Sequence, residues 1–291
     1  MNRRERTNRW TAAARRLMAA VMMMAAAGAS TATAAVNDAD PQHAAFALVA
    51  NAAGTLFKAT ASGLHRSADG GITWTGVPVP GSAHRFLAVP AGARDALYLG
   101  GPGAGIARFD LTTGQLTDIG KGLPNAELAA LAAHATQPDT LYAVLAGDGI
   151  WRTQDAGKTW ERMDKRTANA RRLIHTNLKG SMQTGWLYAI TPDKIRLSMD
   201  CFCLWRNAGA LPEPASAIAF DPSEPATMYA ATPEMVFRSD DGGQNWRRVS
   251  AAGGGVVDIA VTRTGAVFVL MRTGAVLRSA DRGATWEAAG A

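Results

Sequence analysis

Residues that could perform chemistry are few in this 291-residue chain, and their spacing matches no familiar reaction. Four carboxylates fall in expected loops, where glycoside hydrolysis would need two of them about 5–10 Å apart. These four are Asp148, Asp193, Glu213 and Glu234. Nothing in the sequence pairs them, and it has no nucleophile elbow, phosphate-binding loop or dinucleotide fingerprint. We therefore expect no catalytic residues and no cofactor.

The histidines and cysteines indicate no metal site. The five histidines lack ligand spacing; they are His43, His65, His84, His134 and His175. The two cysteines, Cys201 and Cys203, are separated by one residue. An even number suggests a disulfide in an oxidising compartment, but a C-x-C ring fits disulfide geometry poorly. A strained disulfide and two free thiols are the main alternatives, since no histidine lies near enough to complete a zinc site.

The densest positive charge lies just after the middle of the chain, at Lys165, Arg166, Arg171 and Arg172. Four like charges on a loop are usually a solvated face. They are also the best candidates for binding, because such a cluster could contact an acidic protein or an anionic glycan.

A repeat defines the elements that must position these residues. An eight-residue box, S/T-x-D-x-G-x-T/N-W, begins at Ser67, Thr153, Ser239 and Ser279, with an altered copy at Ser198. An aliphatic-aromatic pair precedes each box and also occurs at Tyr98, where the box has decayed to 110–114. Both markers recur about every 40–45 residues and indicate six units.

Each box position has a structural reason. The aspartate accepts backbone N–H bonds across a turn, the hydroxyl returns a bond, and the glycine permits positive φ. The tryptophan packs against the sheet. The residues concerned are Ser67, Asp69, Gly71 and Trp74; Thr153, Asp155, Gly157 and Trp160; Asp200 and Trp205; Ser239, Asp241, Gly243 and Trp246; Ser279, Asp281, Gly283 and Trp286. We expect all of them to be structural.

Each unit has the pattern of four short strands separated by turns. Six such units predict an all-β fold over residues 36–291, a six-bladed β-propeller of four-stranded antiparallel blades. A seven-bladed ring would need one more unit than the sequence contains. Both ends supply complete blades, so we expect the ring to close by packing between blades one and six. Loops after the fourth strands and between second and third strands should form the binding face.

The box resembles the Asp-box, or bacterial neuraminidase repeat, of β-propeller proteins. This resemblance implies that the box lies between third and fourth strands, opposite the active site. A sialidase would also need a tyrosine nucleophile, but all four tyrosines occupy the same second-strand position: Tyr98, Tyr142, Tyr188 and Tyr229. Xyloglucan-degrading relatives place their carboxylates between two propellers, and this chain contains one. The sequence therefore argues against both enzymes.

Leu141–Ala143 and Ile150–Trp160 carry L-Y-A and a hydrophobic-aromatic-R-T-x-D-x-G-x-T-W run. In these motifs the chain resembles small exported propellers of the photosystem II stability and assembly factor type. That resemblance implies a non-catalytic scaffold or accessory factor with a protein partner. A carbohydrate-active propeller, either a lectin or a glycosidase-like protein, is the alternative.

The first 35 residues have the pattern of a secretory signal peptide. A leader with six arginines precedes an apolar run of about 13 residues and then small residues at 32–35. That run is shorter than the roughly 20 residues of a membrane-spanning helix, so we expect no membrane span after cleavage. Five of the six net positive charges lie in this leader. The mature protein therefore gives no charge argument for nucleic acid, and we expect it in the periplasm or outside the cell.

Overall fold

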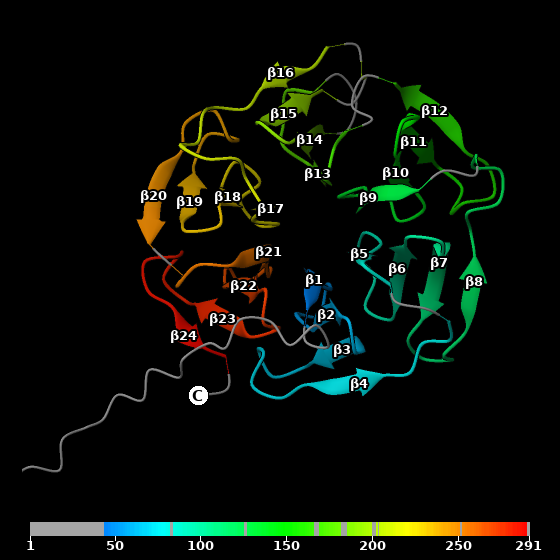
Figure 1. The fold of residues 1–291 in the computed structure, drawn as a ribbon, viewed down its shortest axis with the longest axis horizontal. Helices are drawn as coiled ribbons and strands as arrows, with labels where there is room; N and C mark the ends of the chain where they lie inside the picture. Colours follow the sequence, from blue (N-terminus) through cyan, green and yellow to red (C-terminus); the bar gives the residue numbers. More distant parts are fainter. Residues whose placement is uncertain are drawn as a thin grey trace, which may run out of the picture. The chain divides into compact units, whose positions relative to one another are not determined.

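The structure is a computed structural model, and it describes residues 44–81, 84–124, 127–165, 169–181, 185–199, 202, 204–250 and 252–289. These residues form twenty-four β-strands (Figure 1). Among them no helix is long and apolar enough to cross a membrane. The predicted signal peptide, residues 1–35, lies outside the described residues.

Four consecutive strands make each blade. The first three blades are β1 (Ala45–Ala50), β2 (Leu56–Thr60), β3 (Gly63–Ser67), β4 (Thr75–Val77); β5 (Phe86–Ala88), β6 (Ala96–Gly101), β7 (Gly105–Asp110), β8 (Leu116–Asp118); and β9 (Leu128–Ala133), β10 (Leu141–Leu145), β11 (Gly149–Thr153), β12 (Glu161–Asp164).

The other three are β13 (Arg172–Thr176), β14 (Trp186–Ile190), β15 (Ile195–Ser198), β16 (Arg206–Asn207); β17 (Ala217–Phe220), β18 (Met228–Ala231), β19 (Val236–Ser239), β20 (Arg247–Ser250); and β21 (Val256–Val261), β22 (Val267–Met271), β23 (Val276–Ser279), β24 (Glu287–Ala288).

Each group of four strands forms its own antiparallel sheet, in chain order. Figure 1 shows the six sheets in a ring, with the first strand of each sheet nearest the centre and the fourth at the rim. The prediction of a six-bladed, all-β propeller is thereby confirmed, including the second blade, which lacks a box.

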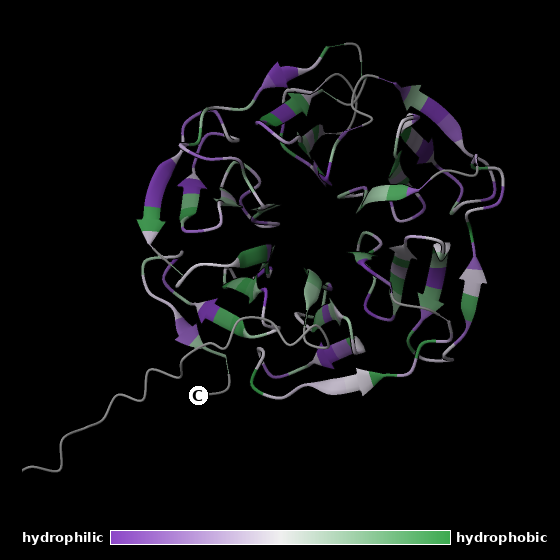
Figure 2. Cartoon of the chain, viewed as in Figure 1, coloured by the Kyte–Doolittle hydropathy of each residue, from purple (hydrophilic) through white to green (hydrophobic). Residues whose placement is uncertain are grey.

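Burial follows the position of a strand in its blade. Second strands are covered on both sheet faces by the neighbouring blades, and every residue of β6, β10 and β18 is buried. Such strands consist of continuous apolar runs without alternation. Outer strands such as β12 and β16 carry hydrophilic residues toward solvent (Figure 2). The hydrophobic core is therefore a set of layers between blades.

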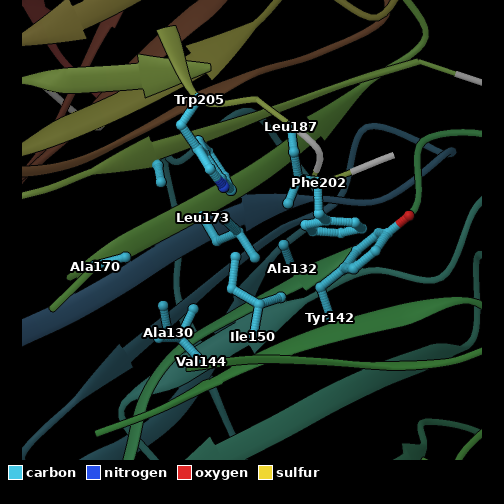
Figure 3. Close-up of a cluster of buried hydrophobic side chains, with 11 residues drawn as sticks. Ala130, Ala132, Tyr142, Val144, Ile150, Ala170, Leu173, Leu187, Phe202 and Trp205 are labelled. Atoms are coloured by element: carbon cyan, nitrogen blue, oxygen red, sulfur yellow. The ribbon is translucent and has the colours of Figure 1, made fainter. Parts of the chain in front are cut away.

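One of these layers lies between blades three and four (Figure 3). Val144 and Ile150 of blade three pack there with Leu187 of blade four. Phe202 lies between the rings of Tyr142 and Trp205, with centroids 6.0 and 6.4 Å away. The aromatic residues thus fill the space that two flat sheets leave between them.

The box aspartates organise the turn between third and fourth strands, as predicted. Asp155 accepts bonds from the Thr159 hydroxyl at 2.6 Å, the Thr159 N–H at 2.9 Å and the Thr153 hydroxyl at 2.8 Å. The Gly157 N–H in turn donates to the Thr153 hydroxyl oxygen at 2.8 Å. Matching bonds surround Asp69, Asp241 and Asp281.

In blades three to six the box also joins the blade to the one before it, which the sequence did not reveal. The Trp160 indole N–H donates to the carbonyl of Ile119, at the end of blade two, at 2.8 Å. Trp205 with Asp164, Trp246 with Ala208 and Trp286 with Ser250 repeat this link. Trp74 instead donates to Gly71 in its own box. The tryptophans therefore fix the angle between successive blades.

The altered fourth box keeps one conformational feature of the others. The fifth box position has positive φ in the regular copies, for example 91° at Gly71 and 90° at Gly157. Phe202 occupies this position with φ 57°, and its side chain is buried. A large residue in this region costs about 1–2 kcal/mol in backbone strain. Its packing between two rings offsets that cost. Asp200, Cys201 and Cys203 lie outside the described residues.

The ring closes without a shared strand. β1–β4 and β21–β24 are two separate, complete sheets. Leu48 and Leu56 of blade one pack against Phe268 and Leu270 of blade six. The Lys58 ammonium also donates to the Gly274 carbonyl across this seam, at 2.8 Å. Closure therefore depends on side-chain packing and a few polar bonds.

Candidate binding pocket in the central channel

The inner strands of all six blades line one pocket with a volume of about 250 Å³. Its lining runs from Leu48 and Asp258, inside the ring, to residues just beyond the strand ends, such as Asn51, Ala91 and Arg263. The first and third strands of a blade run in the same direction. The box turns, which follow the third strands, therefore lie at the same end of the channel as the residues that follow the first strands. We name this end the Asp-box face and the opposite end the connection face. The pocket opens at the Asp-box face.

The floor of the pocket is an ion pair that crosses the ring. The Arg172 guanidinium, from β13 of blade four, lies 3.2 Å from the Asp258 carboxylate of blade six. It also donates to the carbonyls of Phe46 in blade one and Val257 in blade six, both at 2.8 Å. Asp258 accepts a further bond from the Leu48 N–H at 2.8 Å. Arg172 thus bridges blade four to the seam between the first and last blades.

Burial dominates the electrostatics of Asp258. Removal from water raises the pKa of its carboxyl group, and the Arg172 charge and the N–H groups of Leu48 and Ile259 oppose that shift. A buried carboxylate needs such partners to stay ionised. The pair therefore provides a floor with no net charge.

A smaller cavity lies beside Arg172, among blades two, three and four. It has a volume of about 10 Å³ and is lined by residues that include Phe86, Leu131 and Arg171. The Arg85 guanidinium lies over the Phe46 ring, 4.9 Å from its centroid. The channel pocket itself extends to residues beyond the strand ends at the Asp-box face, so a ligand can reach it from that face.

Most side chains that line the pocket are apolar, although polar groups supply nearly half of its exposed surface. Half-buried aliphatic and aromatic side chains come from five inner strands or the turns after them: Val49, Ala50, Val89, Ala133, Ile174 and Phe220. The Asn51 amide also lines the pocket, but its groups are occupied. It donates to the Arg94 carbonyl at 2.7 Å and accepts from the Ala53 and Thr55 N–H groups.

Two buried histidines complete one wall. The rings of His134 and His175 stack with centroids 3.8 Å apart. The His175 Nδ1 atom accepts from the Ala135 N–H, and the His134 Nδ1 atom accepts from the N–H groups of Thr136 and Gln137. These bonds assign the ring proton of each to Nε2. Burial and the neighbouring His134 lower the pKa of His175 to about 3, so it is neutral at physiological pH.

The predicted basic cluster is partly dispersed. Lys165 and Arg171 are exposed near the connection face, and Arg166 lies outside the described residues. The expectation that Arg172 belongs to the same exposed loop was wrong. Arg172 begins β13, and its side chain is 22% exposed because it pairs with Asp258 inside the channel.

Two of the predicted loop carboxylates, Asp193 and Glu213, line a second cavity of about 240 Å³ beside blade four, whereas Asp148 and Glu234 do not. Asp148 accepts from the Trp151 indole at 2.7 Å and pairs with Arg162 at 2.9 Å. Asp193 pairs with Lys194 at 3.0 Å. Neither they nor Glu213 and Glu234 line the channel pocket. Within the described residues, no three histidine, cysteine or acidic side chains are grouped as metal ligands.

The sequence analysis missed Asp258 and placed Arg172 in a loop. One feature of the sequence could have indicated both: a charged residue within an apolar inner strand. The inner strands are almost entirely apolar, for example L-A-A-L-A-A in β9 and A-I-A-F in β17. The structure places one aspartate and one arginine in these six strands: Asp258 in V-V-D-I-A-V and Arg172 at the start of R-L-I-H-T. A charge inside such a run requires a partner, and the two residues supply each other.

Comparisons with known proteins agree with this architecture. The BNR/Asp-box repeat model matches residues 237–248. A search of curated proteins gave no significant match. Among solved structures, a chain of the nidogen/laminin complex is 13% identical with a TM-score of 0.65, covering 80% of this chain and 90% of that one. YCF48 bound to D1 peptide is 17% identical with a TM-score of 0.54, covering 86% and 83%.

A third similar structure is a protein of unknown function from Bacteroides thetaiotaomicron. It is 12% identical with a TM-score of 0.64, covering 81% of this chain and 68% of that one. Identities this low indicate a common fold and leave activity open. The chain is a six-bladed β-propeller that carries BNR/Asp-box repeats.

Proposed function

We propose that this protein is an exported, non-catalytic propeller that holds a partner protein, as a scaffold or accessory factor. The observation that carries this proposal is the chemistry of the channel pocket. Among its described lining residues, Asp258 is the single carboxylate, and it is already paired with Arg172. Glycoside hydrolysis by the usual route needs two carboxyl groups on either side of the bond. The pocket therefore favours binding over hydrolysis.

Two proteins with a similar fold support a protein as the partner. One is part of the nidogen/laminin complex, and the other, YCF48, binds D1 peptide. The support is an analogy between folds, because functions differ widely among proteins that share one architecture.

The exposed charges of Lys165 and Arg171 provide a testable contact for an acidic partner. The tagged full chain is used to capture proteins from extracts of its native envelope, beside the variant with Lys165→Ala and Arg171→Ala. We expect the double variant to lose most of the partner at physiological salt. Lys158→Ala is the matched control, since Lys158 is equally exposed but lies in a box turn at the other face. Equal capture by all three proteins would exclude this loop as the contact.

A carbohydrate-active protein is the alternative. A sugar site would be expected to combine apposed carboxylates with exposed aromatic rings at the channel mouth. Phe220 is the single phenyl, phenol or indole ring among the described lining residues. The channel pocket thus gives this alternative little support. The second cavity, beside blade four, is lined by the carboxylates of Asp193 and Glu213 but by no aromatic ring among its described residues.

Export is part of the proposal and depends on the leader. If residues 1–35 are removed by a signal peptidase, the protein recovered from the periplasm or medium has its N-terminus near Val36. Intact mass measurement of the recovered protein tests this. A mass that includes the leader would contradict export by cleavage.

A further inference from the structure

The channel pocket has the form of a small-molecule site, irrespective of any protein partner. It reaches the Asp-box face, and the pair between Arg172 and Asp258 lies at its inner end. Its volume of about 250 Å³ is near the lower limit for ligand sites, roughly 300 Å³. A folded domain does not fit a pocket of this volume.

The charged and amide side chains within the pocket are already paired. Arg172 and Asp258 form an ion pair, and the Asn51 amide is bonded to backbone groups. The histidine stack lies in a wall; its Nδ1 atoms accept backbone N–H bonds, and the buried His175 Nε2 atom has no partner among the described residues. The other side chains that a ligand would meet are mostly apolar, among them Val49, Val89, Ala133, Ile174 and Phe220.

The rim adds one positive charge without a counterion. Arg263 follows β21 in the turn to β22, lines the pocket and is exposed. No carboxylate pairs with it among the residues that the structure describes. Because the floor pair cancels, Arg263 is the net charge of the described lining. An apolar interior below a free guanidinium favours a ligand with an apolar body and one anionic end.

We propose that the channel pocket binds a small aliphatic carboxylate, with its hydrocarbon chain between the inner strands and its carboxylate at Arg263. Each methylene that enters the apolar interior should tighten binding about fourfold. Affinity should stop rising once the chain reaches the floor formed by Arg172 and Asp258.

The test is calorimetric titration of the purified protein with butanoate, hexanoate, octanoate and decanoate. Hexan-1-ol and hexylamine serve as neutral and cationic control ligands with the same chain length as hexanoate. We expect affinity to rise along the acid series and then level off, with hexan-1-ol at least tenfold weaker than hexanoate and hexylamine weaker still. No binding by any acid, or equal binding of hexanoate and hexylamine, would overturn the proposal.

Variants locate the two ends of the ligand. Arg263→Gln should lower hexanoate affinity to the level of hexan-1-ol and leave hexan-1-ol unchanged. Arg94→Gln is the matched control, because Arg94 is exposed near the same face but its side chain does not line the pocket. Ala133→Phe should weaken the acid and the alcohol alike by filling the pocket. If it fails to fold, the chain-length series and Arg263→Gln still decide. An equal loss in the Arg94 and Arg263 variants would refute the assignment of the carboxylate to Arg263.

Discussion

The Arg172 Nη1 atom lies 3.2 Å from the Asp258 Oδ2 atom, although the two residues belong to blades on different sides of the ring. Asp258 also accepts from Leu48 of blade one, so the pair holds the first and last blades together from across the channel. A propeller without a shared closing strand thus gains a polar link at the seam between its first and last blades.

Removal of one partner should therefore destabilise the whole ring. Arg172→Met leaves the Asp258 carboxylate buried and unpaired, which costs about 3 kcal/mol, the lower end of the range for buried pairs. We expect a clear fall in the urea midpoint of unfolding. The double variant, with Asp258→Leu added, should recover part of the loss, since no charge is left unpaired. A single variant as stable as the parent would contradict a role of this pair in closure.

The box glycines should be sensitive to substitution because they touch the preceding blade. A Cβ atom at Gly157 would lie 2.5 Å from the Ile119 Cβ atom, in a backbone with φ 90°. Gly157→Ala should cost more than the roughly 1–2 kcal/mol of left-handed strain alone. Gly114→Ala is the control, with φ 72° and open space around its Cβ. Thermal unfolding of both variants separates the effect of the contact with Ile119 from that of backbone strain. An equal loss of stability in the two variants would contradict a contact between Gly157 and the preceding blade.

The box aspartates make stability depend on pH in strong acid. Bonds from threonine hydroxyls and N–H groups lower the pKa of Asp69, Asp155 and Asp281 to about 2. At Asp241 burial opposes the shift, but bonds from Asn245 and neighbouring groups still lower its pKa to about 2. An unfolded aspartate has a pKa of about 3.9. The stabilisation is thus present above pH 4 and lost as the pH falls through 2.

Asp155→Asn should make this acid transition shallower, because one of the shifted groups is gone. The measurement is the urea midpoint from pH 2 to 7 for both proteins. An identical pH dependence in the variant would show that Asp155 ionises normally in the folded state.

The buried histidine gives a second, separate pH window. Burial and His134 lower the pKa of His175 to about 3, whereas an unfolded histidine titrates near about 6.5. Between these values the unfolded chain binds a proton that the folded chain does not, so stability declines as the pH falls from 6.5 to 3. The slope from this one group approaches about 1.4 kcal/mol per pH unit. His175→Gln should remove that slope between pH 4 and 6, and an unchanged slope there would contradict the assignment.

The fold could be predicted from the sequence because each repeat carries its own turn chemistry. The bonds around Asp155 lie within a span of a few residues, so the box specifies them wherever it occurs. The number of blades could be predicted by counting the repeats. This holds even for the second blade, where the box is reduced to a short hairpin turn in which Asp110 accepts bonds from the N–H groups of Thr112 and Thr113. Phe202 at a position with positive φ could not be predicted, since its packing partner Tyr142 comes from another blade.

The site could not be predicted because it exists only when the ring is closed. Arg172 meets Asp258 only after blade six has been placed in the ring, and nothing in the neighbouring sequence distinguishes Arg172 from its exposed neighbour Arg171. The apolar inner strands with two isolated charges were the available signal.

Crosslinking of the tagged protein in its native envelope, followed by purification and mass spectrometry, tests the central claim most directly. A propeller that works by holding another protein should bring down one protein partner in a constant ratio near one to one. Recovery of the propeller without a stoichiometric protein, together with hydrolysis or retention of a glycan, would contradict the scaffold and favour the carbohydrate-active alternative.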